Sequence, residues 1–171
     1  NTSENFTDKP ATLPAHLRAW RYAYNDAGDL VGTSDARCCG VNFAYDGAGR
    51  LISEDYSPCR GSHAVYSQPN LTARTGFEVF YRYDTAPPEP LPTGVNLVPG
   101  FIKGRLVATY DRASLTVTEY DGRGRTPASA VRIAKPGTAS DALATRYADR
   151  WYVRSMVFDG ADRELGATTG A

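Results

Sequence analysis

Short runs of alternating apolar and polar residues recur along the chain, and most of them end at an aromatic residue followed by a turn-forming sequence. In residues 41–45, the side chains of Val41, Phe43 and Tyr45 fall on one face of an extended segment, and the residues between them fall on the other. A period of two indicates a β-strand. The same alternation occurs in residues 20–24, 77–83, 104–111, 114–120 and 151–158. The sequence therefore predicts an all-β protein with many short strands.

The residues that follow each aromatic predict a tight hairpin turn. After Tyr45 comes Asp46, whose carboxylate is well placed to accept hydrogen bonds from backbone groups two or three residues further on. Gly49 can adopt the positive φ that closes a short loop beginning with a type I turn. Arg50 follows, and Leu51 restarts the return strand. The predicted fold is a meander of antiparallel β-hairpins.

This tyrosine-aspartate motif repeats along the chain. Its copies, complete or reduced, comprise Tyr24, Asp26 and Gly28; Tyr45, Asp46, Gly49 and Arg50; Tyr83 and Asp84; Tyr110 and Asp111; Tyr120, Asp121, Gly124 and Arg125; and Phe158 and Asp159. A unit of about 38 residues dominates, with a shorter one of about 21 at the front, and such periods indicate stacked supersecondary units. These residues are predicted to have a structural role, with no catalytic residue among them.

Two segments depart from the hairpin pattern. After Asp84 the prolines between residues 87 and 99 replace a tight loop, so a longer excursion of the chain is expected. Residues 140–149 contain good helix formers and predict a short helical turn.

Charge and length exclude several classes of protein. The chain has 19 basic residues (lysine plus arginine) and 19 acidic residues (aspartate plus glutamate), so its formal net charge is zero. No net electrostatic field therefore favours binding to nucleic acid or to an anionic membrane. No run approaches the roughly 18 apolar residues that span a bilayer. The 171 residues show no break in composition, which predicts one repeat array. We expect a lead-in segment at 1–18, the hairpin array at 19–166 and a tail at 167–171.

The start of the chain leaves two interpretations open. Residues 1–5 lack the charged-then-apolar layout of a signal peptide, and the first residue is Asn1 rather than methionine. The chain is therefore either a segment of a longer polypeptide or a processed or cloned domain.

Three cysteines, Cys38, Cys39 and Cys59, leave at least one thiol outside any intrachain bridge. Cys59 could bridge to either of the other two, and the sequence does not choose. His63 with Cys59 could contribute to a three-ligand metal site, but structural zinc prefers four ligands. Buried thiols and a surface histidine are favoured, and neither a metal nor any other cofactor is predicted.

The heptad at residues 45–51 resembles the tyrosine-aspartate (YD) repeat of the rearrangement-hotspot (Rhs) family. This family includes bacterial polymorphic toxin shells, the C components of insecticidal toxin complexes and the extracellular shell of teneurins. Residues 104–125 resemble the repeat almost as strongly, and the resemblance covers about 20–165. The chain departs from the family pattern at Asp29, where arginine or asparagine is usual, and at Phe158, which replaces tyrosine.

The resemblance implies a long β-sheet that spirals into a hollow shell, which in bacterial members encloses a toxic carboxy-terminal domain. It implies that this chain is a non-catalytic structural segment of such a shell, secreted or at the bacterial cell surface. The implied partners are the remainder of a longer Rhs polypeptide and its enclosed toxin or effector. The family's self-cleaving aspartate site has no convincing counterpart here. Open sheet edges of an isolated segment are expected to be adhesive, which would allow self-association.

Two other classes of function are weighed against this one. A carbohydrate- or protein-binding module would use exposed aromatics, for which Trp20, Tyr22, Tyr24 and residues 151–152 are the candidates. An enzyme would use paired carboxylates as acid and base. Turn formation already accounts for the motif aspartates, and no G-x-S-x-G, H-E-x-x-H or phosphate-loop motif is present. Sheet packing is the favoured role of the rings, and no enzymatic activity is expected.

Overall fold

The computed structural model describes residues 19–36, 39–57, 70, 72–137 and 142–168. It consists of two compact units, Asn1–Val79 (unit 1) and Phe80–Ala171 (unit 2), each described here by itself. This division does not test the predicted array boundaries, which stay a prediction. The lead-in at 1–18, Cys38, Cys59 and His63 lie outside the described residues.

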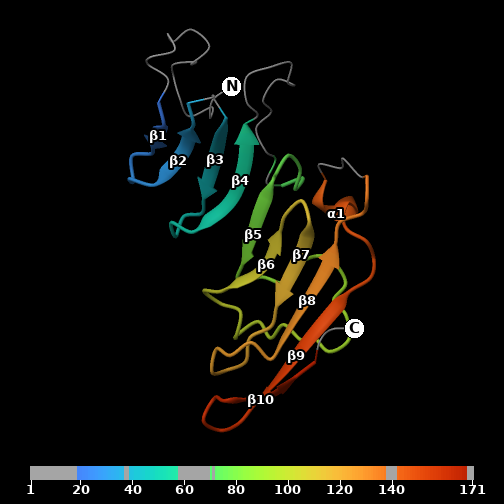
Figure 1. Ribbon diagram of the computed structural model, residues 1–171. Helices are drawn as coiled ribbons and strands as arrows, with labels where there is room; N and C mark the ends of the chain where they lie inside the picture. Colours follow the sequence, from blue (N-terminus) through green and yellow to red (C-terminus); the bar gives the residue numbers. More distant parts are fainter. Residues whose placement is uncertain (1–18, 37–38, 58–69, 71, 138–141, 169–171) are drawn as a thin grey trace. The chain divides into compact units, whose positions relative to one another are not determined.

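Unit 1 contains four strands that pair in chain order. These are β1 (Arg21–Tyr24), β2 (Leu30–Ser34), β3 (Gly40–Tyr45) and β4 (Leu51–Ser57). Each strand is antiparallel to the next, which gives the meander seen in Figure 1. Aromatic and β-branched residues at alternate positions favour these strands, and a turn motif separates β1 from β2 and β3 from β4.

The buried face of this meander is made of small and polar residues. Gly32 lies opposite Asn42, and Asn42 lies opposite Asp55. The buried polar residues on this face are Ser34, Asn42, Ser53 and Asp55. Strand alternation therefore holds in unit 1, although the side that is shielded from solvent is not the more hydrophobic one.

Cys39 lies just before β3 and is disulfide-bonded. Asp35 closes the connection from β2: its backbone N–H donates to the Cys39 carbonyl at 2.8 Å, and its carboxylate accepts from the Cys39 N–H at 2.9 Å. The bonded state rules out the alternative in which Cys39 is the free thiol. Both of its possible partners lie outside the described residues.

Unit 2 is a second antiparallel meander. Its elements are β5 (Val79–Tyr83), which begins at the last residue of unit 1, β6 (Leu106–Tyr110), β7 (Ser114–Thr118), β8 (Ala128–Ile133), α1 (Leu143–Arg146), β9 (Tyr152–Phe158) and β10 (Glu164–Ala167). The strand order follows the chain from β5 to β10 and does not return to its start, so the sheet is open (Figure 1). These features confirm the prediction of an all-β fold of antiparallel hairpins.

The one described α-helix, α1, falls within residues 140–149, where a short helical turn was expected. It has four residues, and no helix in the described part of the chain has the length and hydropathy needed to cross a lipid bilayer.

Unlike unit 1, unit 2 buries an apolar sheet face. Ala108 lies opposite Val117, and Val117 lies opposite Ala130. Tyr110 and Leu115 form the next pair along the same face, and all five residues are buried. Small residues at 108 and 130 flank the larger Val117, an alternation of sizes that suits close packing between neighbouring strands.

Residues 85–103, the proline-rich excursion, cover the buried tyrosine of this face. The Tyr110 hydroxyl donates to a Glu89 carboxylate oxygen at 2.6 Å. The Trp151 indole N–H donates to the Pro90 carbonyl at 3.2 Å. Two apolar residues of the excursion are buried, Val95 and Ile102. The excursion is therefore an ordered part of the core of unit 2.

Candidate functional site in a ladder of aspartate turns

All copies of the motif except the one at Tyr110 and Asp111 occupy every second connection between strands. In unit 1 they join β1 to β2 and β3 to β4; in unit 2 they join β5 to β6, β7 to β8 and β9 to β10. Because neighbouring strands are antiparallel, alternate connections lie at the same end of a sheet. The motif turns of each unit are therefore brought together along one end, and a repeat consists of two strands.

Asp46 closes its turn with both its backbone and its side chain. Its N–H donates to the Arg50 carbonyl and its carbonyl accepts from the Gly49 N–H, both at 3.0 Å. One carboxylate oxygen accepts from the N–H groups of Ala48 at 2.9 Å and Arg50 at 3.0 Å. The other accepts from Arg50 Nε at 2.7 Å. Gly49 has φ 74°, the left-handed region that favours glycine.

Asp121 repeats this geometry in unit 2. Its carboxylate accepts from the N–H groups of Arg123 at 2.9 Å and Arg125 at 3.0 Å, and from Arg125 Nε at 2.7 Å. Gly124, with φ 85°, takes the place of Gly49.

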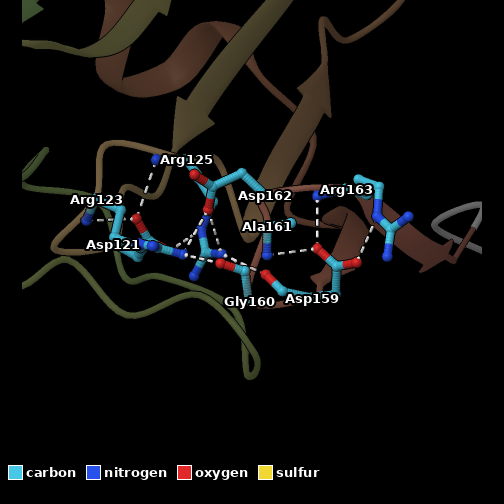
Figure 2. Close-up of polar contacts among 8 residues, drawn as sticks. All are labelled: Asp121, Arg123, Arg125, Asp159, Gly160, Ala161, Asp162 and Arg163. Carbon is cyan, nitrogen blue, oxygen red and sulfur yellow. Dashed lines mark hydrogen bonds and ion pairs between the residues drawn. The ribbon is translucent and has the colours of Figure 1, made fainter.

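The turn at Asp159 is the third copy. Its carboxylate accepts from the N–H groups of Ala161 at 2.8 Å and Arg163 at 2.9 Å, and from Arg163 Nε at 2.7 Å (Figure 2). Asp162, with φ 65°, occupies the left-handed position that glycine holds in the other copies. Aspartate tolerates this conformation better than most residues do.

The hydrogen bonds keep these carboxylates ionised. Backbone N–H donation from the arginine four residues on is the main reason that the pKa values of Asp46 and Asp159 are lowered. For Asp121, burial raises the pKa, but the hydrogen bonds from Arg125 and Arg123 prevail and leave it lowered. An acceptor in a turn benefits from such a shift, whereas a general acid at neutral pH needs the opposite one.

The first turn departs from the prediction. The sequence placed Asp26 at the aspartate position, but Asn25 makes the characteristic bonds: its N–H donates to the Asp29 carbonyl at 3.0 Å, and its side-chain oxygen accepts from the Asp29 N–H at 2.8 Å. Its amide nitrogen donates to an Asp29 carboxylate oxygen at 2.9 Å. Gly28 keeps its predicted place, with φ 88°. In this turn a neutral asparagine, Asn25, therefore stands at the aspartate position, and a carboxylate, that of Asp29, stands at the arginine position.

The copy at Tyr83 and Asp84 is split by the proline-rich excursion. The Asp84 N–H donates to the Arg105 carbonyl at 3.2 Å, and the Asp84 carboxylate accepts from the Gly104 N–H. Gly104 has φ 72°, and Tyr83 pairs with Leu106. Residues 104–106 therefore end this turn just as residues 49–51 end the turn at Asp46, although the chain between them is much longer.

The reduced copy at Tyr110 and Asp111 lies at the opposite end of the sheet of unit 2, in the connection from β6 to β7. The Asp111 carboxylate accepts from the N–H groups of Ala113 at 2.7 Å and Ser114 at 2.6 Å, without a glycine. Tyr110 points into the core, where its ring centroid lies 5.8 Å from that of Phe80. This copy forms a hairpin but does not belong with the other motif turns.

Tyrosine hydroxyls join successive motif turns. The Tyr45 hydroxyl donates to the Leu30 carbonyl at 2.9 Å, and the Tyr120 hydroxyl donates to the Leu106 carbonyl at 2.9 Å. In both cases the acceptor is the residue just after the arginine position of the preceding turn. Burial is the main cause that raises the pKa of both hydroxyls, so they remain protonated donors. Phe158 has no hydroxyl to make the equivalent bond.

Arginines make a second link between turns in unit 2. The Arg105 guanidinium lies 4.9 Å from the Tyr120 ring centroid and donates to the Gly124 carbonyl at 3.3 Å. The Arg125 guanidinium lies 5.2 Å from the Phe158 ring centroid and donates to the Asp159 carbonyl at 3.2 Å. Each arginine belongs to one turn and lies over the aromatic ring of the next, a cation–π contact.

The carboxylate of Asp162 binds two arginines of the preceding turn, Arg123 and Arg125. One of its carboxylate oxygens accepts from Arg123 at 2.7 Å and from Arg125 at 2.9 Å, and Arg123 also donates to the Gly160 carbonyl at 3.0 Å (Figure 2). The sequence prediction included Arg125 but not Arg123 or Asp162. We call the motif turns of a unit, with the tyrosine and arginine contacts between them, the turn ladder.

Among the residues that the structure describes, no group of three or more His, Cys, Asp or Glu residues is arranged to hold a metal ion. What the arrangement does chemically is to hold one β-hairpin against the next through directed hydrogen bonds and stacked side chains.

The sequence matches no protein-family model and no curated protein, whereas the fold matches solved structures of toxin complexes. The crystal structure of TcdB2-TccC3-Cdc42 is similar with a TM-score of 0.62 and 14% identity, over 90% of this chain and 7% of that chain. A Tc holotoxin pore from Photorhabdus luminescens gives a TM-score of 0.63 and 15% identity, with the same coverage. At this identity the likeness establishes the fold, and the chain spans a small fraction of the chains that it matches.

Proposed function

We propose that this chain is a non-catalytic wall segment of a YD-repeat shell of the Rhs type, which encloses a toxin or effector polypeptide. The observation that carries the proposal is the turn ladder: the same aspartate turn recurs, and within each unit successive copies are linked by tyrosine hydrogen bonds or, in unit 2, by arginine contacts. Such nearest-neighbour construction suits an extended wall, because every added hairpin makes the same contacts. The shared fold with toxin-complex chains supports the assignment.

The proposal includes the absence of catalysis. The motif carboxylates are already used as turn acceptors, and hydrogen bonding lowers the pKa values of Asp46, Asp121 and Asp159. Groups held ionised in this way are poor proton donors at neutral pH. The proposed partners are the remainder of a longer polypeptide and the cargo that it encloses, in a secreted or cell-surface setting.

Cryo-electron microscopy of the natural full-length polypeptide tests this function. We expect residues 19–166 to lie in a continuous β-wall, with further hairpins on both sides and a separate polypeptide inside. Limited proteolysis of the same sample should leave the enclosed segment intact until the wall is cut. A natural polypeptide in which these hairpins stand alone, with nothing enclosed, would rule the proposal out.

A second function is supported by the exposed aromatics of unit 1. Tyr22 and Tyr24 are exposed and alternate along β1, so they share one face, and the exposed Trp20 lies just before the strand. Such rings suit a carbohydrate or a partner protein. A glycan array with the whole chain tests this alternative: a hit that is lost in Trp20→Ala would favour a binding module, and an array without hits would remove the carbohydrate version.

A further inference from the structure

A row of side chains crosses the sheet of unit 2 on the face opposite the buried one. Residues directly opposite each other in paired strands point to the same side of a sheet. From β5 to β9 the strand register places in this row Tyr81, Thr109, Thr116, Val131 and Tyr152. All five are half-buried, whereas Tyr110 and Leu115 on the other face are buried. With roughly 4.8 Å between strands the row is about 19 Å long, the length of about six extended residues. We call it the tyrosine–threonine row.

Unit 1 has an equivalent row at the same place in its repeat. Its members are Tyr22, Thr33, Val41 and Tyr56. Tyr22 and Tyr81 each lie two residues before a motif tyrosine, and Thr33 and Thr109 each lie three residues after the leucine that pairs with that tyrosine. Tyr22 is 55% exposed and Tyr56 is 48% exposed. The recurrence indicates that the row is a feature of the repeat.

The opposite face of unit 2 is closed by the proline-rich excursion. Besides the bonds from Tyr110 and Trp151, a Glu119 carboxylate oxygen accepts from the Asn96 N–H at 2.8 Å. The Phe101 ring lies against Gly122, where an added Cβ would be 3.3 Å from it. Residues 85–103 therefore occupy the place that a partner of this face would need. In unit 2 the face with the tyrosine–threonine row is the one open to a partner.

The open face is basic as well as aromatic. Arg154 alternates with Tyr152 along β9 and is exposed, and the Arg150 guanidinium lies 4.8 Å from the Tyr152 ring centroid. In strands β5 to β9, all of which the structure describes, no aspartate or glutamate lies on this face. Ile133, at the end of β8, is 52% exposed and adds an apolar contact. Arginine favours carboxylates, and the hydroxyls of tyrosine and threonine can bond to peptide groups. The face therefore complements an extended acidic peptide.

From this complementarity we propose that the tyrosine–threonine row of unit 2 lies on the inner side of the wall and binds an extended segment of the enclosed polypeptide that carries aspartate or glutamate. Residues 85–103 then lie on the outer side. The inference rests on the proposed function, since the row can bind an enclosed polypeptide only where one exists. Arg150 and Arg154 pair with the carboxylates of the segment, and the rings of Tyr81 and Tyr152 contact its apolar parts.

Photo-crosslinking in the natural full-length polypeptide tests this assignment. Thr116→p-benzoylphenylalanine places a photoreactive group in the middle of the row. Thr93→p-benzoylphenylalanine is the matched control, because it replaces an exposed threonine of the excursion. We expect position 116 to crosslink to the enclosed polypeptide, at peptides that contain aspartate or glutamate, and position 93 not to do so. Mass spectrometry of the digested products identifies the crosslinked peptides.

A change of charge tests the chemistry of the row. Arg154→Gln should lower the crosslinking yield at position 116 about threefold, the scale of one exposed ion pair. Lys103→Gln is the control, since it removes an exposed cation of the excursion with the same change of charge. Equal yields in the two variants would exclude an acidic partner segment.

The crosslinks also separate this inference from the proposed function. Crosslinks to the enclosed polypeptide from position 93 but not from 116 would reverse the two sides of the wall and overturn the inference. So would an absence of crosslinks from 116, or crosslinks from it only to other wall segments or to a second copy. The wall function survives each of these results if the enclosed polypeptide stays protected from protease until the wall is cut. Thr109→p-benzoylphenylalanine, in the same row, replaces the variant at 116 if the latter alters that protection.

Discussion

Units 1 and 2 contain the same aspartate turn but connect successive turns in different ways. In unit 1 the Tyr45 hydroxyl donates to the Leu30 carbonyl, and the residue at the arginine position is Asp29. Burial is the main cause that raises the pKa of Tyr45, and the negative charge of Asp29 raises it further. In unit 2 the equivalent position holds Arg105, whose charge lowers the pKa of Tyr120 against the larger effect of burial. The comparison separates two roles of the motif: closing a turn and joining it to the next one.

The buried faces of the units differ as well. Unit 2 buries apolar residues such as Val117 and Leu115, whereas the buried positions of unit 1 include Ser34 and Ser53. Hydrophobic burial scales with apolar area removed from water, so it stabilises the strands of unit 2 more than those of unit 1. Four predictions test these contrasts, from the largest expected effect to the smallest.

Leu115→Ala should lower the free energy of unfolding by about 3 kcal/mol, because the side chain is fully buried and its removal leaves a cavity. Ser53→Ala on the buried face of unit 1 should change it by less than about 1 kcal/mol, since only a hydroxyl is lost. Urea unfolding followed by circular dichroism measures both. Equal losses at the two positions would contradict the contrast between the buried faces.

Gly124→Ala should cost about 2 kcal/mol. Alanine is strained at φ 85°, and a Cβ there would lie 2.8 Å from the Arg105 guanidinium, which would have to move off the Tyr120 ring. Gly28→Ala in unit 1 is the matched control, because it has the same backbone strain but nothing within 4 Å of the added atom. Its cost should be about 1 kcal/mol. Thermal unfolding that ranks the two variants in reverse would show that Arg105 does not tie the turns together.

Tyr120→Phe and Tyr45→Phe should each cost about 1 kcal/mol, because both remove one hydrogen bond to a backbone carbonyl. Replacement by leucine separates the two sites. Tyr120→Leu should cost about 0.5 to 1 kcal/mol more than Tyr45→Leu, since only Tyr120 lies under an arginine. Chemical denaturation at matched conditions measures these differences, and identical losses for the two leucine variants would exclude a stabilising role for Arg105.

Asp46→Asn should have the smallest effect at neutral pH, because Asn25 shows that an asparagine can close this turn. The pKa of Asp46 is lowered in the folded chain, so the unfolded chain binds the proton more readily. Its contribution to stability is therefore present above the ordinary aspartate pKa of about 3.9 and is lost as the pH falls through the lower folded pKa. Melting temperatures from pH 7 down to pH 3 should fall less steeply in the variant; parallel curves would contradict this.

The strands could be predicted from the sequence because their signal is local. The alternation that ends at Tyr45 and the glycine at 49 suffice to indicate a hairpin, and β3 and β4 lie where this pattern predicts them. The contacts between turns could not be predicted in the same way. Arg105 meets Tyr120 only because alternate connections share one end of the sheet, which depends on the order of pairing.

Two details of the turn ladder could not be predicted from the sequence, each for a different reason. Asn25 and Asp26 are adjacent residues that both favour turns, so only the backbone geometry decides which one makes the bonds. Residues 104–106 looked like the start of a strand, although Gly104 and Arg105 finish the turn that Asp84 begins. A comparison of the triplet at 104–106 with that at 49–51, both glycine, arginine and leucine, is the signal that would have found it.

The split turn has a consequence for how such a chain can diversify. Since Tyr83 and Leu106 meet in the same register as Tyr45 and Leu51, the length of the intervening sequence does not set the spacing of the flanking strands. Evolution can therefore add residues at exposed positions of the segment and give the molecule a new surface, while the strand register stays unaltered and the buried Val95 and Ile102 keep their places in the core. For the protein engineer, the exposed residues 93–94 are a suitable place to insert a foreign peptide.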